Sequence, residues 1–514
     1  MPRILLIVFL CGVSGISMAE DISKAAYLSP GTADVNYLCL IYHGQERRVN
    51  WTAENLRPYV ACLDKDEKPI GWLFDSFLFI EFATDSGKSL YHYAPDAAQA
   101  DGADWAWLSD AWFREETGLI GLEQCVSEVG VALNDPDHKV NVVITLPVPL
   151  HQINEFNNLP GTDKPLNFTI EEDRQQALEW YIRTVSERFA AAGYHHLNLL
   201  GFYWTGESIV AEQHDTLRWT AAYLHERQLK FYWIPYFTAA GVEHWRDVGF
   251  DAMMLQPNYF FKGDGGINRL MLAAKRALLL GSGVEMEFDG RAFSSDEHYQ
   301  RYWDYLDAGV KYGWMKDALI GWYEGGGALL QMFEEGEKGR AMYDALCRFV
   351  KGDYMPGDTD RLPELQVVPP PEKSENLALA SRGATVHGAI DDGQIGLAPE
   401  QMVDGKSLIY TGTSGFTWFS IPGSVTVQLP ETAMVNRTRT LFFDLDGRTY
   451  TYCIETSTDG EHWEPAVDKR EGEWSSWQLD TFPARQAGFL RITGLSNSTG
   501  QHLCQIVEFE AYGK

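Results

Sequence analysis

Short apolar runs alternate with amphipathic stretches over the first two thirds of the chain. Apolar runs of this length are typical of parallel strands that are buried on both faces. One amphipathic stretch has Thr169 before Glu171 and Glu172 and ends at Gly193, which are helix start and stop signals. The predicted strands are Tyr37–Tyr42, Trp72–Phe82, Val140–Pro147, Leu197–Trp204, Lys230–Phe237, Ala252–Gln256, Val284–Phe288 and Ala318–Tyr323, and the clearest predicted helices are Ile170–Ala192, Asp215–Arg227, Gly266–Leu280 and Asp296–Tyr312.

Eight strands separated by helices over about 330 residues predict an α/β fold of the (β/α)8 barrel type. An open, doubly wound sheet is the alternative. It is less favoured because no glycine-rich phosphate turn follows an early strand.

The pattern changes after a proline-rich segment at residues 351–375, which has the composition of a semi-rigid linker. Beyond it, residues 376–514 show short alternating strands separated by turn residues, which predict an antiparallel β-sandwich. The strands expected there are Ser424–Leu429, Thr440–Leu445, Thr449–Ser457, Phe489–Thr493 and Ile506–Tyr512. The predicted organisation is therefore a barrel over residues 20–350, the linker, and the sandwich.

The amino-terminal residues 1–19 have the features of a secretory signal peptide. Arg3 precedes the apolar run Ile4–Val13, and Ser17-Met18-Ala19 fits a small-x-small cleavage pattern. A membrane anchor is the alternative, and no later segment predicts a membrane span. We therefore expect a secreted or periplasmic protein of unknown oligomeric state.

Composition narrows the choice of partners. The 514 residues carry a formal net charge of −30, and 13% of them are aromatic. Nucleic acids and anionic membranes require a basic surface, so both are disfavoured. An acidic, aromatic-rich chain suits neutral, hydroxyl-rich ligands better.

The cysteines are scattered and show no zinc-ligand spacing, so no metal or other cofactor is expected for catalysis. An exported location permits disulfides. Cys453 with Cys504 is the first pair to test, and free thiols are expected elsewhere.

Carboxylates follow two of the predicted strands. Glu207 comes after the fourth strand and a run of aromatic residues. In the seventh, Glu285, Glu287 and Asp289 alternate with apolar residues, so the three acids share one face. Burial and like charge both oppose ionisation, so a purely structural strand would not be expected to carry three inward acids. The alternatives are a loop acid at Glu207 and a solvated strand at 283–290.

Two opposed carboxylates are what glycosidic-bond cleavage requires, one as acid and the other as nucleophile or base. We assign Glu207 as acid/base and Glu287 as nucleophile or base, with Glu285 as the alternate. The layout resembles that of the large retaining (β/α)8 glycoside hydrolase clan, but Gly206 stands where that clan has Asn, so retention does not follow. A non-catalytic glycan-binding barrel and a lyase or esterase using Tyr203 or His43 remain as rivals.

Polar and aromatic residues at other strand ends are candidate groups for binding an oligosaccharide or polysaccharide, because aromatic faces stack on sugars and polar side chains bind hydroxyls. Each of them could equally belong to the core or to a loop. The candidates are Tyr42, His43, Asp75, Tyr203, Trp204, Tyr236, Gln256, Asn258, Tyr259, Asp289, Trp322 and Glu324.

Four segments of the first region resemble an uncharacterised family of exported proteins common in polysaccharide-degrading gut Bacteroidetes. They are Trp72–Phe79, Gly201–Glu207, Gln256–Tyr259 and Gly283–Glu287. The resemblance implies a glycoside-hydrolase-like barrel and supplies no substrate.

Residues 376–514 resemble a discoidin-like module of the coagulation-factor type C class. The resemblance is carried by Asn376–Ala378, Ser381–Ala384, Val403–Gly405, Tyr452–Trp463, Phe489–Ile492 and Val507–Tyr512. It implies sugar binding at one end of the sandwich and a structural calcium, with Asp404 near such a site. The module could also serve only to brace the barrel. Trp418, Trp474 and Trp477 are candidates for ligand stacking or for packing.

Overall fold

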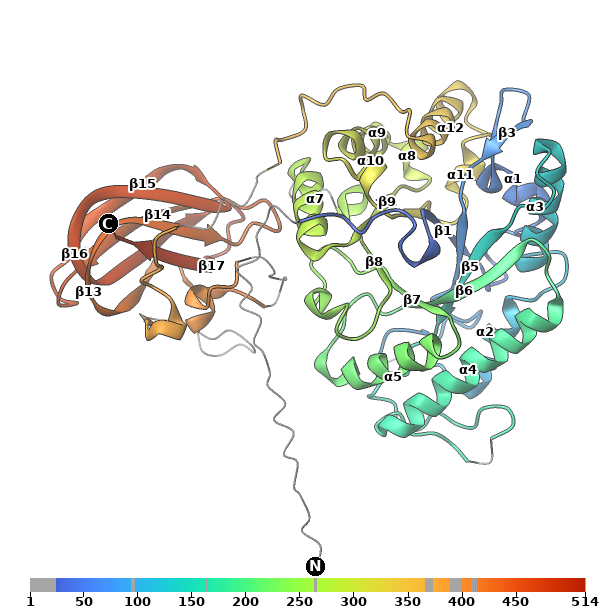
Figure 1. Cartoon of the computed structure of the whole chain (residues 1–514), viewed down its shortest axis with the longest axis horizontal. Coiled ribbons are helices and arrows are strands. Elements are labelled where there is room, and N and C mark those ends of the chain that lie inside the picture. Colours follow the sequence, from blue (N-terminus) through green and yellow to red (C-terminus); the bar gives the residue numbers. More distant parts are fainter. Residues whose placement is uncertain are drawn as a thin grey trace, which may run out of the picture.

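The computed structural model describes residues 25–93, 98–162, 164–262, 266–365, 373–388, 399–407, 410, 412 and 414–513. A closed parallel barrel is followed by an antiparallel β-sandwich that lies beside it (Figure 1). The predicted fold class is therefore confirmed. The signal peptide predicted at residues 1–19 lies outside the described residues.

The barrel strands run in parallel in the order β1-β10-β9-β8-β7-β6-β5-β4. Because the sheet closes on itself, it has no unpaired edge. The strands are β1 (Tyr37–Tyr42), β4 (Ser76–Ile80), β5 (Val140–Leu146), β6 (Leu197–Trp204), β7 (Lys230–Trp233), β8 (Ala252–Leu255), β9 (Gly283–Glu287) and β10 (Ile320–Tyr323). In chain order β6 is the fourth barrel strand and β9 the seventh, as predicted.

Helices surround the barrel, and a small antiparallel pair, β2 (Ala61–Leu63) and β3 (Pro69–Trp72), lies between β1 and β4 in the chain. The helices are α1 (Ala53–Val60), α2 (Gly102–Ala111), α3 (Leu119–Leu133), α4 (Glu171–Ala192), α5 (His214–His225), α6 (Tyr259–Lys262), α7 (Asn268–Leu280), α8 (Arg291–Ser294), α9 (Asp296–Lys311), α10 (Trp314–Asp317), α11 (Ala328–Gln331) and α12 (Gly336–Lys351).

Helix α4 illustrates how the sequence sets these boundaries. Acids fill its first turn, where they complement the helix dipole, and it ends at Gly193 with φ of 64°, a left-handed conformation that suits glycine. The predicted N-cap is wrong by one residue. Ile170 occupies that position, and the Thr169 hydroxyl instead donates to Asn167 Oδ1 at 2.7 Å.

The sandwich strands follow the order β12-β17-β13-β16-β14-β15, and β11 also pairs with β13. The strands are β11 (Thr385–Gly388), β12 (Thr417–Ser420), β13 (Gly423–Phe442), β14 (Tyr450–Ser457), β15 (Glu464–Trp474), β16 (Trp477–Asn497) and β17 (Leu503–Tyr512). β13 merges two predicted strands into one, and bulges bend it along its pairing with β16.

The first part of the linker packs against the barrel. The Tyr354 hydroxyl donates to Asp307 of α9 at 2.7 Å, and Lys311 donates to the Leu362 carbonyl at 2.7 Å. Tyr354 and Leu362 are buried. The linker is therefore anchored on α9 as far as the described residues reach at 365.

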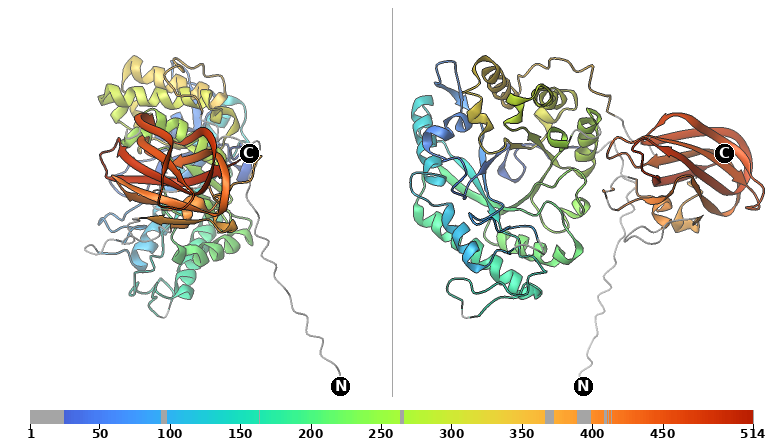
Figure 2. Two further views of the ribbon diagram at one scale, coloured as in Figure 1. Left: turned by 90° about the vertical axis from the view of Figure 1, so that its left-hand side faces the viewer. Right: turned by 180° about the vertical axis from the view of Figure 1, so that it is seen from behind.

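The sandwich docks on α7 of the barrel, and two views from different sides agree on this placement (Figures 1 and 2). Lys275 Nζ lies 3.6 Å from Asp444 Oδ2, and the Arg276 guanidinium donates to the Tyr410 carbonyl. The amide of Gly412 donates to the Thr238 carbonyl at 3.3 Å. We call these contacts, with the rings around them, the α7 interface.

The α7 interface is also apolar. Rings of the sandwich belong to the same buried cluster as the barrel core, among them Tyr410, Phe416, Trp418 and Phe443. Burial lowers the pKa of Arg276 to about 10, although Tyr410, Glu243 and Asp444 oppose this effect. Part of the sandwich therefore belongs to the barrel's hydrophobic cluster, while the rest of the sandwich forms a second core of its own.

All six cysteines in the described residues are free thiols, so Cys453 and Cys504, the first pair to test, form no disulfide. Cys453 on β14 pairs with Thr493 of β16, whereas Cys504 on β17 pairs with Phe419 of β12. The two thiols lie on strands that are not neighbours in the sheet.

Candidate functional site

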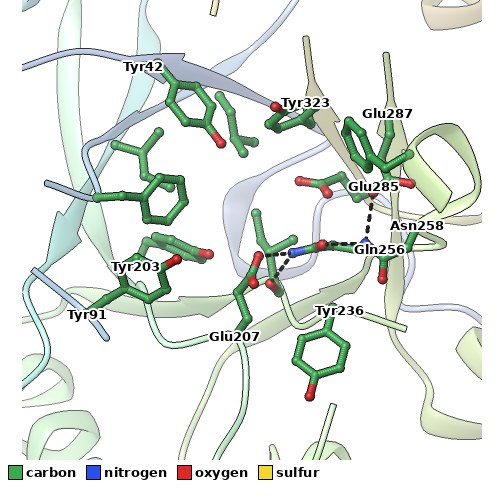
Figure 3. Close-up of a pocket in the computed structure, with 15 residues that line it drawn as sticks. Tyr42, Tyr91, Tyr203, Glu207, Tyr236, Gln256, Asn258, Glu285, Glu287 and Tyr323 are labelled. Carbon is green, nitrogen blue, oxygen red and sulfur yellow. Dashed lines mark hydrogen bonds between the residues drawn. The ribbon is translucent and has the colours of Figure 1, made fainter. Parts of the chain in front are cut away.

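A pocket of about 440 Å³ opens at the carboxyl-terminal ends of the barrel strands (Figure 3). Its position is the one where the loops of a (β/α)8 barrel build ligand sites. The lining residues are Leu40, Tyr42, Ile80, Phe82, Tyr91, Tyr203, Glu207, Ile234, Tyr236, Gln256, Asn258, Phe261, Glu285, Glu287 and Tyr323. The pocket therefore brings together Glu207 from beyond β6 and two carboxylates from β9.

Two amides join Glu207 to Glu287. Gln256 Nε2 donates to Glu207 Oε1 at 2.8 Å, and Asn258 Nδ2 donates to Gln256 Oε1 at 2.9 Å. The same Asn258 nitrogen lies 3.3 Å from Glu287 Oε1. This chain, which we call the amide bridge, holds the two carboxylates in one hydrogen-bonded network (Figure 3).

Glu287 has a second donor behind it. The Tyr305 hydroxyl on α9 donates to Glu287 Oε2. Burial raises the pKa of Glu287 to about 8, and the hydrogen bonds from Tyr305 and Asn258 partly offset this rise because they favour the charged form. Glu287 is thus a buried carboxyl whose ionised form is supported by two donors.

Glu285 lies two residues earlier on the same face of β9. Its side chain lines the pocket with 3% exposure, and within the described residues it makes no hydrogen bond to another residue. Burial raises its pKa well above the usual range, and the charges of Glu287 and Glu207 add to this rise. Glu285 therefore faces the cavity without a donor from the surrounding chain.

Aromatic rings supply much of the remaining wall, including five tyrosines. None of the fifteen described lining residues is Lys, Arg or His. Arg48 is not among the lining residues; its guanidinium lies 5.0 Å from the Tyr42 ring and pairs with Glu81 at 2.9 Å. The walls thus offer hydroxyls, amides, rings and negative charge.

Three predicted binding residues lie outside the pocket because adjacent side chains of a strand point to opposite faces. His43 follows Tyr42 and lies 2.9 Å from the Ala111 carbonyl, where burial lowers its pKa to about 4. Trp204 follows Tyr203, and its ring lies 6.3 Å from that of Phe231. Trp322 precedes Tyr323 and packs between Phe74 and Phe349.

Asp75 is at the wrong end of the barrel for the predicted role. β4 begins at Ser76, one residue after it, so Asp75 lies at the amino-terminal end, opposite the pocket. Its carboxylate accepts from the backbone amides of Asn36 and Tyr37 at 3.0 and 2.9 Å. It ties the start of β1 to the start of β4.

Three other candidates near strand ends also point elsewhere. Glu324 is buried and accepts from the Tyr59 hydroxyl and the Gly327 amide, both at 2.8 Å. Tyr259 donates to Asp304 at 2.7 Å. Asp289 lies beyond the end of β9 and pairs with Arg291 at 2.7 Å, so only two of the three acids expected on the inward face line the pocket.

Several pocket residues carried no signal in the sequence. Phe82 and Tyr91 follow β4 in a long excursion before α2, and Phe261 lies on the short helix α6. Tyr305 reaches Glu287 from α9, a segment for which the sequence predicted only a helix. The sequence argument searched only the ends of predicted strands, so it could not identify a pocket partner that lies on a helix.

Comparison with known proteins identifies the barrel. Residues 37–348 match the family model described as a domain of unknown function, DUF4855. The chain belongs to the DUF4855 family. Residues 388–509 match the F5/8 type C domain, so the predicted pairing of an uncharacterised family with a discoidin-like module is confirmed.

The similarity of this DUF4855 protein to other named proteins is partial. BTB/POZ domain-containing protein 9 of Rattus norvegicus is 34% identical over 110 residues, which cover 21% of this chain and 18% of that protein. The human protein of the same name gives the same values. The chain thus spans less than a fifth of the length of these relatives.

Two solved structures are similar to part of this DUF4855 protein. The CBM32 of AlyQ in complex with 4,5-unsaturated mannuronic acid is 22% identical, with a TM-score of 0.22, over 25% of this chain and 95% of that one. Chitosan-binding module 1 of a chitosanase/glucanase from Paenibacillus sp. IK-5 is 25% identical, with a TM-score of 0.22, over 27% and 99%. Among the described residues of the DUF4855 protein, no helix combines the length and apolarity needed to cross a membrane.

The F5/8 type C domain contains one arrangement that suits a hard cation. Glu508 is fully buried, its Oε1 has no hydrogen-bond partner, and its Oε2 accepts from the Gly405 amide at 3.2 Å. The charges of Glu510 and Asp404 help burial to raise its pKa. Oxygen donors are the ligands calcium prefers, so Glu508 and Asp404 fit such an ion. Neither here nor elsewhere in the described residues do three or more His, Cys, Asp or Glu side chains form a group that could hold a metal, so any ion would rest on these two carboxylates and other oxygen donors.

The three tryptophans of this domain are engaged in packing. Trp418 is buried in the α7 interface. Trp477 packs against the same cluster, with the Arg439 guanidinium 4.8 Å from its ring. Trp474 packs on the sandwich core with Lys469 Nζ 4.1 Å from its ring.

Proposed function

We propose that this DUF4855 barrel is a glycoside hydrolase that cleaves an oligosaccharide or polysaccharide by a two-carboxylate mechanism, in an exported protein. The observation that carries the proposal is that Glu207 and Glu287 line one pocket and are joined by the amide bridge. Stacking rings, hydroxyls and amides in the same wall suit a sugar ring and its hydroxyl groups.

The assigned roles follow from the partners of each carboxylate. In the proposal Glu207 protonates the leaving oxygen, and Glu287 attacks the anomeric carbon or activates a water. The donors Tyr305 and Asn258 partly offset the burial that raises the pKa of Glu287 to about 8, so the ionised form that a nucleophile or base requires becomes populated as the pH approaches that value. Retention and inversion both remain open. Glu285 is the alternate if Glu287 does not serve.

The second candidate is a barrel that binds glycans without cleaving them. The observation that favours it is the same wall of rings and amides, which would serve binding equally well. The two candidates differ in turnover and not in the site they use.

A screen of polysaccharides and aryl glycosides with the full chain tests the proposal. Wild type is compared with Glu207→Gln, Glu287→Gln and the matched control Asp289→Asn, which changes an acid just outside the pocket. We expect turnover by wild type and the control and loss in the two pocket variants. Activity retained by both pocket variants would overturn the assigned roles. Saturable binding without turnover by any form would favour the second candidate.

The C-terminal domain has a bracing role in this proposal. The end of the sandwich that carries Tyr410 and Asp444 is occupied by the α7 interface. A sugar-binding role is left to the opposite end, where the turn at residues 458–463 lies. Binding of soluble glycans to the intact chain, compared with a variant altered at the exposed His462 in that turn, tests this assignment.

A further inference from the structure

We propose that the pocket takes a sugar unit with a free, positively charged amino group, and that Glu285 holds the ammonium. This inference deepens the proposed function, since it names a substrate class for the same site. It assigns Glu285 a positioning role in binding, separate from the cleavage roles of Glu207 and Glu287.

The first observation is the state of the Glu285 side chain. The side chain is only 3% exposed and it faces the cavity. It has no hydrogen-bond partner among the described residues. A buried carboxyl without donors is costly, and such groups in folded proteins are nearly always satisfied. By contrast Glu287 accepts from Asn258 and Tyr305, and Glu207 accepts from Gln256. The cavity side is where a donor for Glu285 has to come from.

The second observation is the charge of the wall. Three carboxylates line the pocket, and no cationic residue is present among the described lining residues. Arg48 and Arg291 lie near the rings of Tyr42 and Phe261 and are paired with Glu81 and Asp289, and the charge of Arg269 acts on Glu287. Acidic groups therefore outnumber basic ones around the cavity, which disfavours an anionic sugar and attracts an ammonium group.

An ammonium group also matches the site chemically. It presents three donors and no acceptor, and its hydrogen bonds to a carboxylate are stronger than those of a neutral hydroxyl.

The position of Glu285 leaves the cleavage residues free. Glu285 and Glu287 are two residues apart on one strand, which corresponds to roughly 7 Å along β9. The strand runs toward the mouth, so Glu285 is the deeper of the two. An amino group bound there would lie about one sugar ring from Glu287.

Calorimetric binding to the full chain tests the inference. The probes are a hexosamine oligosaccharide with free amines, its N-acetylated form, and a uronic acid oligosaccharide of the same length. We expect wild type to bind the free amine about 10-fold or more tightly than the N-acetylated form, with the difference shrinking at high salt, and to bind the uronic acid weakest. In Glu285→Gln the amine preference should fall towards one, and in Glu285→Asp, which keeps the charge, it should remain.

Equal or tighter binding of the N-acetylated form, or an unchanged preference in Glu285→Gln, would overturn the inference. Thermal unfolding of each variant shows whether it is folded. Turnover is measured separately. Cleavage of neutral glycans without a preference for amines would contradict this inference and support the hydrolase proposal. A preference for amines without any cleavage would support this inference and contradict the hydrolase proposal.

Discussion

The pocket end of the barrel and the barrel-facing end of the sandwich both bury charged groups among aromatic rings, but in opposite ways. At the α7 interface, Lys275 and Arg276 face Asp444 and the Tyr410 carbonyl, so cations meet acceptors. In the pocket, Glu285 faces Glu287 and Glu207, so like charges meet. A permanent buried contact requires opposite charges. Buried groups of like charge are stable only if a bound ligand compensates them or a proton neutralises one of them.

The largest expected effect lies in the pocket. Glu207→Gln keeps the hydrogen bond to Gln256 within reach but removes the proton donor, so turnover should fall about 10²- to 10⁴-fold. Steady-state kinetics on any substrate found by the screen measures this, with Asp289→Asn as control. An equal loss of turnover in Glu207→Gln and Asp289→Asn would mean that Glu207 has no specific role in cleavage.

The α7 interface should respond in stability and not in chemistry. Asp444→Ala leaves Lys275 and Arg276 buried without their acid, at a cost of about 3–5 kcal/mol. Denaturant unfolding measures it, and limited proteolysis near the linker should accelerate. The control Asp468→Ala removes an exposed acid that pairs with Arg470 at 3.0 Å, and should cost less than about 1 kcal/mol. Similar costs for both variants would contradict the contrast between the two regions.

The pH dependence of stability should sharpen the contrast further. The pKa of Glu287 is raised from 4.5 to about 8, so between these pH values the folded chain keeps a proton that the unfolded chain has lost. The free energy of unfolding should therefore fall as pH rises through this window, by at most about 1.4 kcal/mol per pH unit for this group. Denaturant unfolding from pH 5 to about 8 measures the slope.

Glu287→Gln is the matched variant for that slope, because it removes the titrating group. Its curve should be flatter, with a residual fall from Glu324, whose pKa burial raises to about 7, and from Glu285 and Glu508, whose pKa values are also raised. Parallel curves for wild type and variant would show that Glu287 does not carry the raised pKa.

The smallest effect is expected at Glu508 and Asp404. If they hold calcium, a chelator should lower the thermal midpoint by roughly 2–4 °C, equivalent to about 1 kcal/mol. Glu508→Gln should abolish the response, whereas Asp468→Ala should keep it. A midpoint unaffected by calcium and chelator alike would remove the ion from this site.

The fold was largely predictable because its signals are local. Runs such as Leu197–Trp204 are apolar enough to be recognised as buried strands, and β6 has those bounds. β15 was missed because its exposed residues are mostly charged and its place in the sheet comes from pairing with β14. The joining of two predicted strands into β13 depends on its partner β16, which no local pattern reveals.

The site was predictable only where alternation along a strand applies. Alternation correctly placed Glu285 and Glu287 on the same face. Taking two adjacent residues at each strand end as candidates, however, also included His43, Trp204 and Trp322, which lie on the opposite face. The prediction for Asp75 was wrong because the predicted strand began at Trp72, four residues before the true start of β4 at Ser76. Tyr305 and the amide bridge depend on distant elements meeting, which only the folded chain specifies.

The shared core at the α7 interface has a practical consequence for anyone who would treat the two regions as exchangeable parts. Cutting the chain at the linker would uncover Arg276 together with the rings that now enclose it. A barrel expressed alone would expose an apolar surface that promotes aggregation. A foreign F5/8 type C domain fused in place of the native sandwich would leave Lys275 without an ion-pair partner unless it carried an acid equivalent to Asp444. The smallest portable unit of this protein is therefore the barrel and sandwich together.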